Sequence, residues 1–345
     1  MKNLLRHLSG LLTQPVIWFF ILFSAASSAC AIGYAEHPKA KELAQKLEIE
    51  NNIPQEKTLR LLASAQRNNK VIQLYSPKET QKRSSDWDTY RKQFVEPFRI
   101  QEGLQFWQDN QMMLQEAELR YGVPASVIVA IIGVETLYGR NMGTDKVLDA
   151  LATLSFDFPS GTRDRSPFFY NELGAFIVLT EQLSMDATTV KGSYAGAMGL
   201  GQFMPTSWQT YAVDGDGDGK IDLLTNLKDG IFSVANFLKE HGWKTGHAML
   251  VPIEFNHKDH LDTLLAPDIV PTFTAKEMTQ KGVELKRKTL EEEKLALIKL
   301  VQGDKPATYV VGGQNFFVVT RYNRSSFYAT AVLELAEAIE AKMKK

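Results

Sequence analysis

The sequence predicts a mainly helical (α+β) protein with a small β lobe late in the chain. Apolar residues recur at helical spacing up to about Trp243, and short runs of β-branched and aromatic residues follow. With 345 residues the chain is long enough to bury a full core and to hold two or three lobes. The net charge is −1 and charged residues make up 23% of the chain, so no strong field indicates nucleic acid as a partner.

Residues 1–30 have the pattern of a secretory signal peptide. Lys2 and Arg6 precede an apolar run over 16–23, and small residues dominate 24–29. The apolar run is shorter than the roughly 20 residues that span a bilayer, and no later segment is both long and apolar enough. We therefore expect an exported protein that is not integral to a membrane.

The single cysteine, Cys30, directly follows this segment, and one cysteine excludes a disulfide within the chain. The sequence 28–30, Ser-Ala-Cys, fits the end of a bacterial lipobox, but Ser27 stands where that motif usually has an aliphatic residue. Two interpretations stay open: a lipid anchor on Cys30, or ordinary cleavage of the signal peptide nearby.

Two helical regions precede the β lobe. The N-terminal region, 36–109, combines short helices with a polar break over 76–85 and an aromatic stretch over 87–107. Glycine and proline mark helix ends in the second region, 110–243. Its periodicity predicts helices at 110–121, 124–139, 144–154, 168–185 and 227–241.

The β lobe is expected over 244–320. Strand-like runs lie at 251–255, 272–274, 295–301 and 309–320. In the last run, Gly312 and Gly313 stand between β-branched and aromatic residues, which predicts a hairpin. The C-terminal segment, 321–345, is expected to return to the core and to contain a helix that begins near Ser326.

Glu135 is the only charged residue in the otherwise apolar stretch 123–139. At helical spacing Ile128, Ile131 and Ile132 share its face. An apolar site disfavours the ionised carboxylate and raises its pKa. Glu135 is therefore either a paired structural carboxylate or a proton donor that its surroundings keep neutral.

A glycine-rich segment over 192–208 is the second candidate site. It lacks the Gly-Lys-Ser/Thr ending of a phosphate loop, and no strand precedes it as in a dinucleotide site. Pro205 is expected to open a short helix, which leaves Ser193 and Gln202 on the loop before it. Taken alone, the glycines favour close packing of two helices.

Together, Gly133–Gly139 (Gly-Val-Glu-Thr-Leu-Tyr-Gly) and the segment Gly192–Pro205 resemble the membrane-bound lytic transglycosylase B family. These bacterial enzymes cleave the glycan strands of peptidoglycan on a lysozyme-like fold. The resemblance continues through 233–236, Gly242-Trp243 and 321–328, and covers roughly 85–335. It implies a lysozyme-like catalytic core over 110–243 and a protein of the bacterial periplasm, with an outer-membrane anchor if Cys30 is lipidated. We further expect a monomer.

The resemblance also implies the residues of the site. Glu135 matches the catalytic acid/base, and the other matching positions are expected to face the sugar: Ser193, Gln202, Tyr322 and Asn323. Tyr90 and Tyr328 are candidates for stacking on a sugar ring, although each can equally be a core or surface aromatic.

One loop departs from the family pattern. Where relatives carry an arginine pair, this chain has Ser160-Gly161, and Arg163 and Arg165 follow a few positions later. Contact of this loop with the stem peptide is therefore not implied.

Most glycosidases use two carboxylates, and no compelling second one accompanies Glu135. The nearby aspartates also suit helix caps or solvated faces: Asp145, Asp149 and Asp157. The acetamido group of the substrate can replace a second carboxylate. We therefore expect cleavage between MurNAc and GlcNAc with formation of a 1,6-anhydro end. The alternatives are a lysozyme-type hydrolase and a non-catalytic peptidoglycan-binding scaffold.

Residues 214–219, Asp-Gly-Asp-Gly-Asp-Gly, match the opening of an EF-hand loop. Lys220 is expected to contribute its backbone carbonyl, and Asp222 stands at loop position 9. Thr225 replaces the usual glutamate at position 12, so Asp229 is the nearest carboxylate that can close the shell. The sequence predicts a structural Ca²⁺ and no organic cofactor. Its predicted ligands are Asp214, Asp216, Asp218, Lys220 and Asp229.

Overall fold

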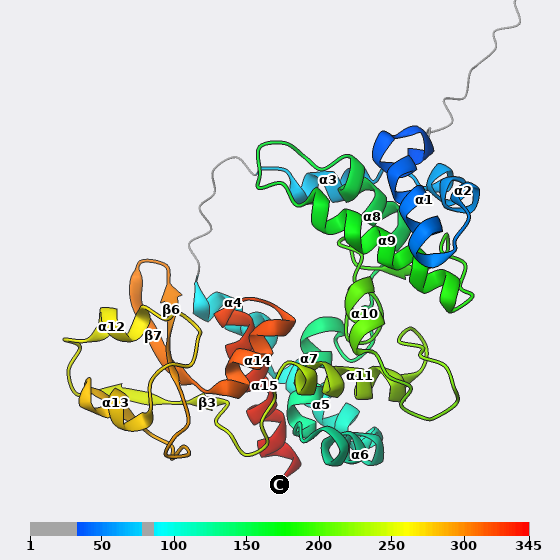
Figure 1. Ribbon diagram of the computed structural model, residues 1–345. Coiled ribbons are helices and arrows are strands. Elements are labelled where there is room, and N and C mark those ends of the chain that lie inside the picture. Colours follow the sequence, from blue (N-terminus) through cyan, green and yellow to red (C-terminus); the bar gives the residue numbers. More distant parts are fainter. Residues whose placement is uncertain (1–32, 78–85, 345) are drawn as a thin grey trace, which may run out of the picture. The chain divides into compact units, whose positions relative to one another are not determined.

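The computed structural model describes residues 33–77 and 86–344. The predicted signal peptide and Cys30 lie outside the described residues. The described chain is mainly helical with small antiparallel sheets, which confirms the predicted fold class (Figure 1). Its helices begin and end within a few residues of most sequence predictions.

The first helices pack on a long helical hairpin. That hairpin consists of α8 (Val147–Phe156) and α9 (Ser166–Gln182). Helix α1 contacts α9, and α3 contacts α8. The packing helices are the short 3₁₀ turn η1 (Tyr34–Glu36), α1 (Pro38–Asn51), α2 (Gln55–Ser64) and α3 (Asn69–Tyr75).

The next helices surround α7 (Ala125–Thr136), whose residues are nearly all buried. A helix that is hydrophobic all round needs neighbours on every side. Its neighbours are α5 (Pro97–Asp109), α6 (Gln111–Tyr121), α11 (Leu227–Glu240) and α15 (Ser326–Met343) (Figure 1). Helix α4 (Trp87–Phe94) packs on α15 as well. The N-terminal region therefore divides: α1–α3 contact the α8–α9 hairpin, whereas α4 and α5 belong with α7 and α15.

No single helix in the described ranges is long and apolar enough to cross a membrane. Helices α6 and α7 are long and apolar enough only when taken together, and the chain bends by 113° between them. Gly122 makes this bend possible, because its φ of +70° is a conformation that glycine adopts readily.

The β lobe consists of two small sheets. The first has the antiparallel order β3 (Leu250–Val251), β7 (Lys305–Gly312), β6 (Ala296–Gln302), and the second pairs β4 (Ile253–Phe255) with β5 (Val283–Leu285). Short helices α12 (Leu261–Leu265) and α13 (Ala275–Gln280) cover them. The lobe has a core of its own, formed by Val251, Leu264, Met278, Val283, Leu295, Leu297 and Val311.

The predicted hairpin at 309–320 is wrong. Strand β7 ends at Gly312, and helix α14 (Gln314–Tyr322) follows. The hairpin joins β6 to β7, with Gly303 at φ +60° in its turn. Position 312 needs glycine because of packing and not because of a turn. A Cβ there would lie 2.5 Å from the ring of Phe316. The run at 272–274 forms only an isolated bridge, so the predicted strand there is also wrong.

Candidate active site

The end of α7 has an unusual backbone. The helix stops at Thr136, and both Leu137 and Tyr138 have left-handed conformations, with φ of 50° and 59°. Such conformations cost on the order of 1–3 kcal/mol each outside glycine and persist only when neighbours hold them. The Tyr138 hydroxyl donates to the Arg99 carbonyl at 2.8 Å, which fixes this turn against α5. The strained segment directly follows Glu135.

Thr136 joins this turn to the glycine loop. Its hydroxyl lies 3.0 Å from the carbonyl oxygen of Leu200 and 3.1 Å from that of Ile132. The same oxygen accepts a hydrogen bond from the Gly139 amide at 3.0 Å. A buried threonine thus ties the two segments of the family resemblance to each other.

Glu135 lies on the last turn of α7, and its side chain stays partly accessible. Burial raises the pKa of Glu135 to about 7, and a hydrogen bond from Tyr328 opposes that rise. The Tyr328 hydroxyl donates to Glu135 Oε1 at 2.6 Å. A carboxyl group with a pKa near neutrality can both give and take a proton. The apolar stretch therefore holds a carboxyl group suited to acid/base chemistry.

The three tyrosines of the predicted site have different positions. Tyr328 is 2% exposed, so of the two interpretations of this residue the structure favours the core aromatic. Tyr322 donates its hydroxyl to the Gly201 carbonyl at 2.6 Å. Tyr90 is half-buried, and burial raises its pKa, to which the charge of Glu135 adds. The Tyr90 ring also packs against Trp87, Phe94 and Phe327.

The glycine loop precedes α10 (Pro205–Tyr211), as predicted. The Oγ of Ser193 accepts from the Ala197 amide at 3.0 Å and from the Ala195 amide at 3.3 Å, so its own O–H remains able to donate. Gln202 has φ +52°, and its Nε2 donates to the carbonyls of Gly199 and Met142 at 3.0 and 3.2 Å.

Gly201 allows α14 to approach this loop. A Cβ at this position would lie 2.7 Å from the Tyr322 hydroxyl oxygen and 2.9 Å from Val234. Asn323 follows α14 in an extended conformation and is exposed. Within the described parts of the chain, Ser193, Gln202 and Asn323 make no hydrogen bond to Glu135. The structure brings Tyr328 into direct contact with Glu135. The Ser193 O–H, the Gln202 Oε1 and the exposed Asn323 side chain have no partner among the described residues.

Sequence reasoning missed the residues that support Glu135. Arg99 donates to the Gly133 carbonyl, and Tyr138 packs against Gly133 so closely that a Cβ there would lie 2.5 Å from its hydroxyl. A Cβ at Gly103 would also lie 2.5 Å from the Tyr138 hydroxyl oxygen. Gly103 in α5 and Gly133 in α7 were the signal in the sequence that could have indicated this contact. A glycine inside a helix, away from a turn, often marks close packing.

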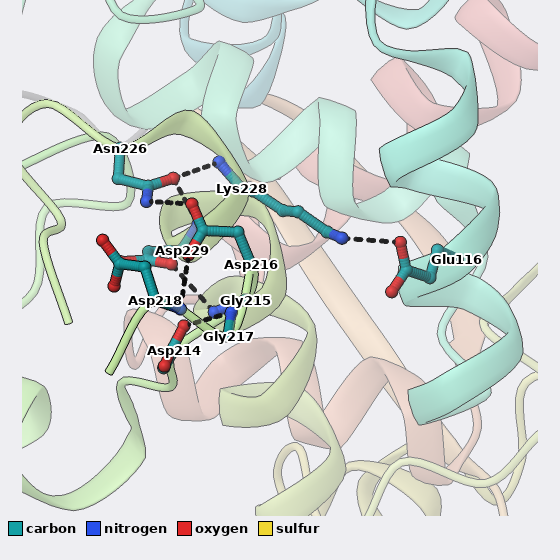
Figure 2. Close-up of polar contacts among 9 residues, drawn as sticks. All are labelled: Glu116, Asp214, Gly215, Asp216, Gly217, Asp218, Asn226, Lys228 and Asp229. Carbon is teal, nitrogen blue, oxygen red and sulfur yellow. Dashed lines mark hydrogen bonds and ion pairs between the residues drawn. The ribbon is translucent and has the colours of Figure 1, made fainter. Parts of the chain in front are cut away.

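The acidic loop forms the second polar cluster. Carboxylate oxygens of Asp214, Asp216 and Asp229 lie within 4.8 Å of one another (Figure 2). Asp229 is fully buried, and its two oxygens accept from the amides of Gly215 at 2.8 Å and Asp222 at 2.7 Å. Burial and the two neighbouring aspartates raise the pKa of Asp229.

The remaining predicted ligands lie outside this group. Asp218 Oδ1 accepts from the Lys220 amide at 2.8 Å, and neither residue joins the cluster of three. Asn226 caps α11 and also donates to Asp216 at 2.8 Å. Three converging carboxylates with one buried member are the donor set that a hard divalent cation prefers.

Known proteins resemble this chain over most of its length. The family model for the transglycosylase SLT domain matches residues 35–337. The membrane-bound lytic murein transglycosylase B of Escherichia coli K12 is 36% identical over 317 residues, which cover 89% of this chain and 84% of that protein.

Solved structures show the same likeness. The soluble lytic transglycosylase SltB1 from Pseudomonas aeruginosa has a TM-score of 0.80 and 38% identity, covering 89% of this chain and 100% of that one. The Escherichia coli lytic transglycosylase Slt35 in complex with calcium has a TM-score of 0.77 and 33% identity, with coverage of 92% and 99%. SltB3 from Pseudomonas aeruginosa in complex with NAG-NAM-pentapeptide has a TM-score of 0.73 and 28% identity, with coverage of 87% and 78%.

Proposed function

The chain belongs to the SLT-domain family of lytic transglycosylases that act on peptidoglycan, and from that membership we propose its reaction in detail. It cleaves the β-1,4 bond between MurNAc and GlcNAc and leaves a 1,6-anhydro-MurNAc end. The observation that carries this proposal is Glu135, a carboxyl group with a pKa of about 7 at the end of a buried helix.

In the first step, neutral Glu135 protonates the bridging oxygen, and the bond to C1 of MurNAc breaks. The acetamido oxygen of the same sugar stabilises the positive charge that develops at C1. In the second step, the Glu135 carboxylate removes the proton of the 6-hydroxyl, whose oxygen closes on C1. The proton returns to Glu135, and no water is consumed. A pKa close to the working pH suits a residue that acts in both directions.

The aspartates considered as second carboxylates have structural partners. Asp145 pairs with Lys70 at 3.1 Å. Asp149 accepts from the Gln66 amide at 2.9 Å. Asp157 accepts from the Tyr34 hydroxyl at 2.7 Å. Each fastens the N-terminal region to α8 or to a residue close to one of its ends. This favours a mechanism with one protein carboxylate.

Substrate-binding roles follow from the free polar groups. The Ser193 O–H can donate to the acetamido oxygen, while Gln202 and Asn323 can bind sugar hydroxyls. Tyr90 offers a ring face to a sugar. Tyr322 acts indirectly, because its hydroxyl positions the glycine loop through Gly201.

Mass spectrometry of the muropeptides released from purified sacculi tests the reaction. Wild-type protein is expected to release products with the anhydro ring, and Glu135→Gln is expected to release none. Products heavier by one water would show a hydrolase. Failure of both proteins to release products, with calcium supplied, would favour a peptidoglycan-binding scaffold.

We also propose that Asp214, Asp216 and Asp229 hold a structural Ca²⁺. Three carboxylates at this separation repel one another, and a divalent cation removes that repulsion. The complex of the similar Slt35 with calcium supports this assignment. Ca²⁺ is expected to raise the Tm of the wild type and to leave that of Asp229→Asn unchanged. A calcium-independent Tm in the wild type would contradict the proposal.

For localisation we propose export to the bacterial periplasm, with Cys30 either lipidated or removed by nearby cleavage. The mass of the mature N-terminal peptide separates the two outcomes. We also propose that the protein is a monomer, which sedimentation tests.

A further inference from the structure

We propose that a cavity lined in part by Phe327, the residue before Tyr328, binds the acidic stem peptide that muramic acid carries. This inference rests on the proposed function and adds a second part of the substrate to it. The cavity measures about 430 Å³. Its polar lining comes from the loop after α12, from β6 and from the turn between α14 and α15, and consists of Asp268, Lys299, Arg324, Ser325 and Ser326.

The cavity has two cations and one anion. Lys299 and Arg324 are exposed, and within the described ranges no acidic side chain forms an ion pair with either of them. Asp268 is exposed with a left-handed φ of +56°. Unpaired cations favour carboxylates, and Asp268 favours an ammonium group. This combination suits a short peptide with several carboxylates and one free amino group.

Phe327 connects the cavity to the aromatic residues Trp87 and Tyr90. Its ring lines the cavity, and its centroid lies 5.4 Å from that of Trp87 and 5.6 Å from that of Tyr90. The next residue, Tyr328, donates to Glu135. The peptide is attached to the lactyl group of muramic acid, so a muramic acid placed at Glu135 brings its peptide close to this wall.

The loop over 157–165, where the family resemblance has an arginine pair, offers less. It carries Gly161 in place of an arginine, and Arg165 lies over two aromatic rings, 4.9 Å from the Phe168 centroid and 5.2 Å from that of Phe169. That guanidinium is already engaged with its own helix. Arg163 is the remaining exposed cation there, and it provides a comparison.

The test compares kcat/KM on two substrates: soluble glycan strands with their peptides, and the same strands after an amidase has removed them. The double variant Lys299→Ala, Arg324→Ala is expected to lose about 5- to 20-fold on the first substrate, as befits two solvent-screened ion pairs. The loss should fall on KM, diminish at high salt and be absent on peptide-free strands. Lys276→Ala removes an exposed cation elsewhere in the β lobe and serves as the matched control.

Each outcome has a distinct meaning. Equal loss on both substrates, or no loss on either, would overturn the peptide site. A peptide-selective loss in Arg163→Ala and not in the double variant would place peptide recognition at the other loop. Substitution by the other cation, Lys299→Arg with Arg324→Lys, is expected to retain most of the selectivity. If the wild type cleaves neither substrate, the proposed function itself fails.

Discussion

The hydrogen bond between Tyr328 and Glu135 should set the pH range of the enzyme. Tyr328→Phe removes the hydroxyl that donates to Glu135 Oε1 at 2.6 Å. That bond stabilises the carboxylate and lowers the pKa of Glu135, whereas burial raises it to the net value of about 7. Removal of the hydroxyl leaves burial unopposed, so the pKa of Glu135 should rise further.

The size of the rise follows from the strength of the bond. A hydrogen bond to a charged group contributes about 1.5–3 kcal/mol. Only part of this free energy affects the pKa, because the protonated carboxyl group also interacts with the hydroxyl. One pKa unit corresponds to about 1.36 kcal/mol. The pKa of Glu135 should therefore rise by roughly one unit. Phenylalanine fills the same apolar volume, so the cavity cost is small.

The assay is the pH profile of kcat/KM on soluble glycan strands. The proposed mechanism starts from neutral Glu135, so activity falls as pH rises through its pKa. In Tyr328→Phe this alkaline limb should move to higher pH by roughly one unit. The variant also stabilises the Glu135 carboxylate of the second step less than the wild type does.

The matched control is Tyr322→Phe. This variant removes a hydroxyl that donates to the Gly201 carbonyl and not to Glu135. Its alkaline limb should stay near that of the wild type even if its rate falls. An alkaline limb that stays in place in Tyr328→Phe, or that moves to lower pH, would refute the assignment of this bond.

Three further predictions concern stability. Glu135 has a folded pKa of about 7 against an ordinary 4.5, so its favourable contribution is complete below about pH 4.5 and is lost as pH rises through 7. Glu135→Gln should therefore raise the free energy of unfolding by about 2–3 kcal/mol at pH 8 and little at pH 4, measured by urea titration. Thr136→Val should cost about 1–3 kcal/mol by leaving the Leu200 carbonyl unpaired, and an unchanged urea midpoint would contradict this. Gly201→Ala should lower both Tm and activity, because its Cβ meets the Tyr322 hydroxyl at 2.7 Å.

The sequence predicts helices well where periodicity and punctuation agree. Helix α6 ends at Tyr121, directly before Gly122, and α10 begins at Pro205, both as expected. It fails at Gly312-Gly313, where two glycines indicate a turn by local rules. Their actual cause is the packing of Gly312 against Phe316 and the start of α14 at Gly313. Local patterns carry no information about which later side chain occupies that space.

In the candidate site, too, features set by the local sequence were predictable and features set by contacts between distant residues were not. Glu135 was predictable because one charge in an apolar helix is visible in the sequence, and its raised pKa follows from burial. Tyr328 was identified as a site residue, but its role was not, because its contact joins positions 193 residues apart in the chain. Thr136 gave no signal, since a threonine at a helix end is unremarkable until Leu200 is placed beside it.

These contacts explain how one carboxyl group can serve both steps of the proposed reaction. A glutamate that only donates a proton needs burial alone, and one that only accepts needs a stabilised carboxylate. Glu135 receives both influences, burial from α7 and a hydroxyl from α15. The strained turn at 137–138 and Thr136 hold that helix end against the glycine loop. Changes in the loop should therefore alter the pH profile as well as substrate affinity, whereas changes in the peptide cavity should alter affinity alone.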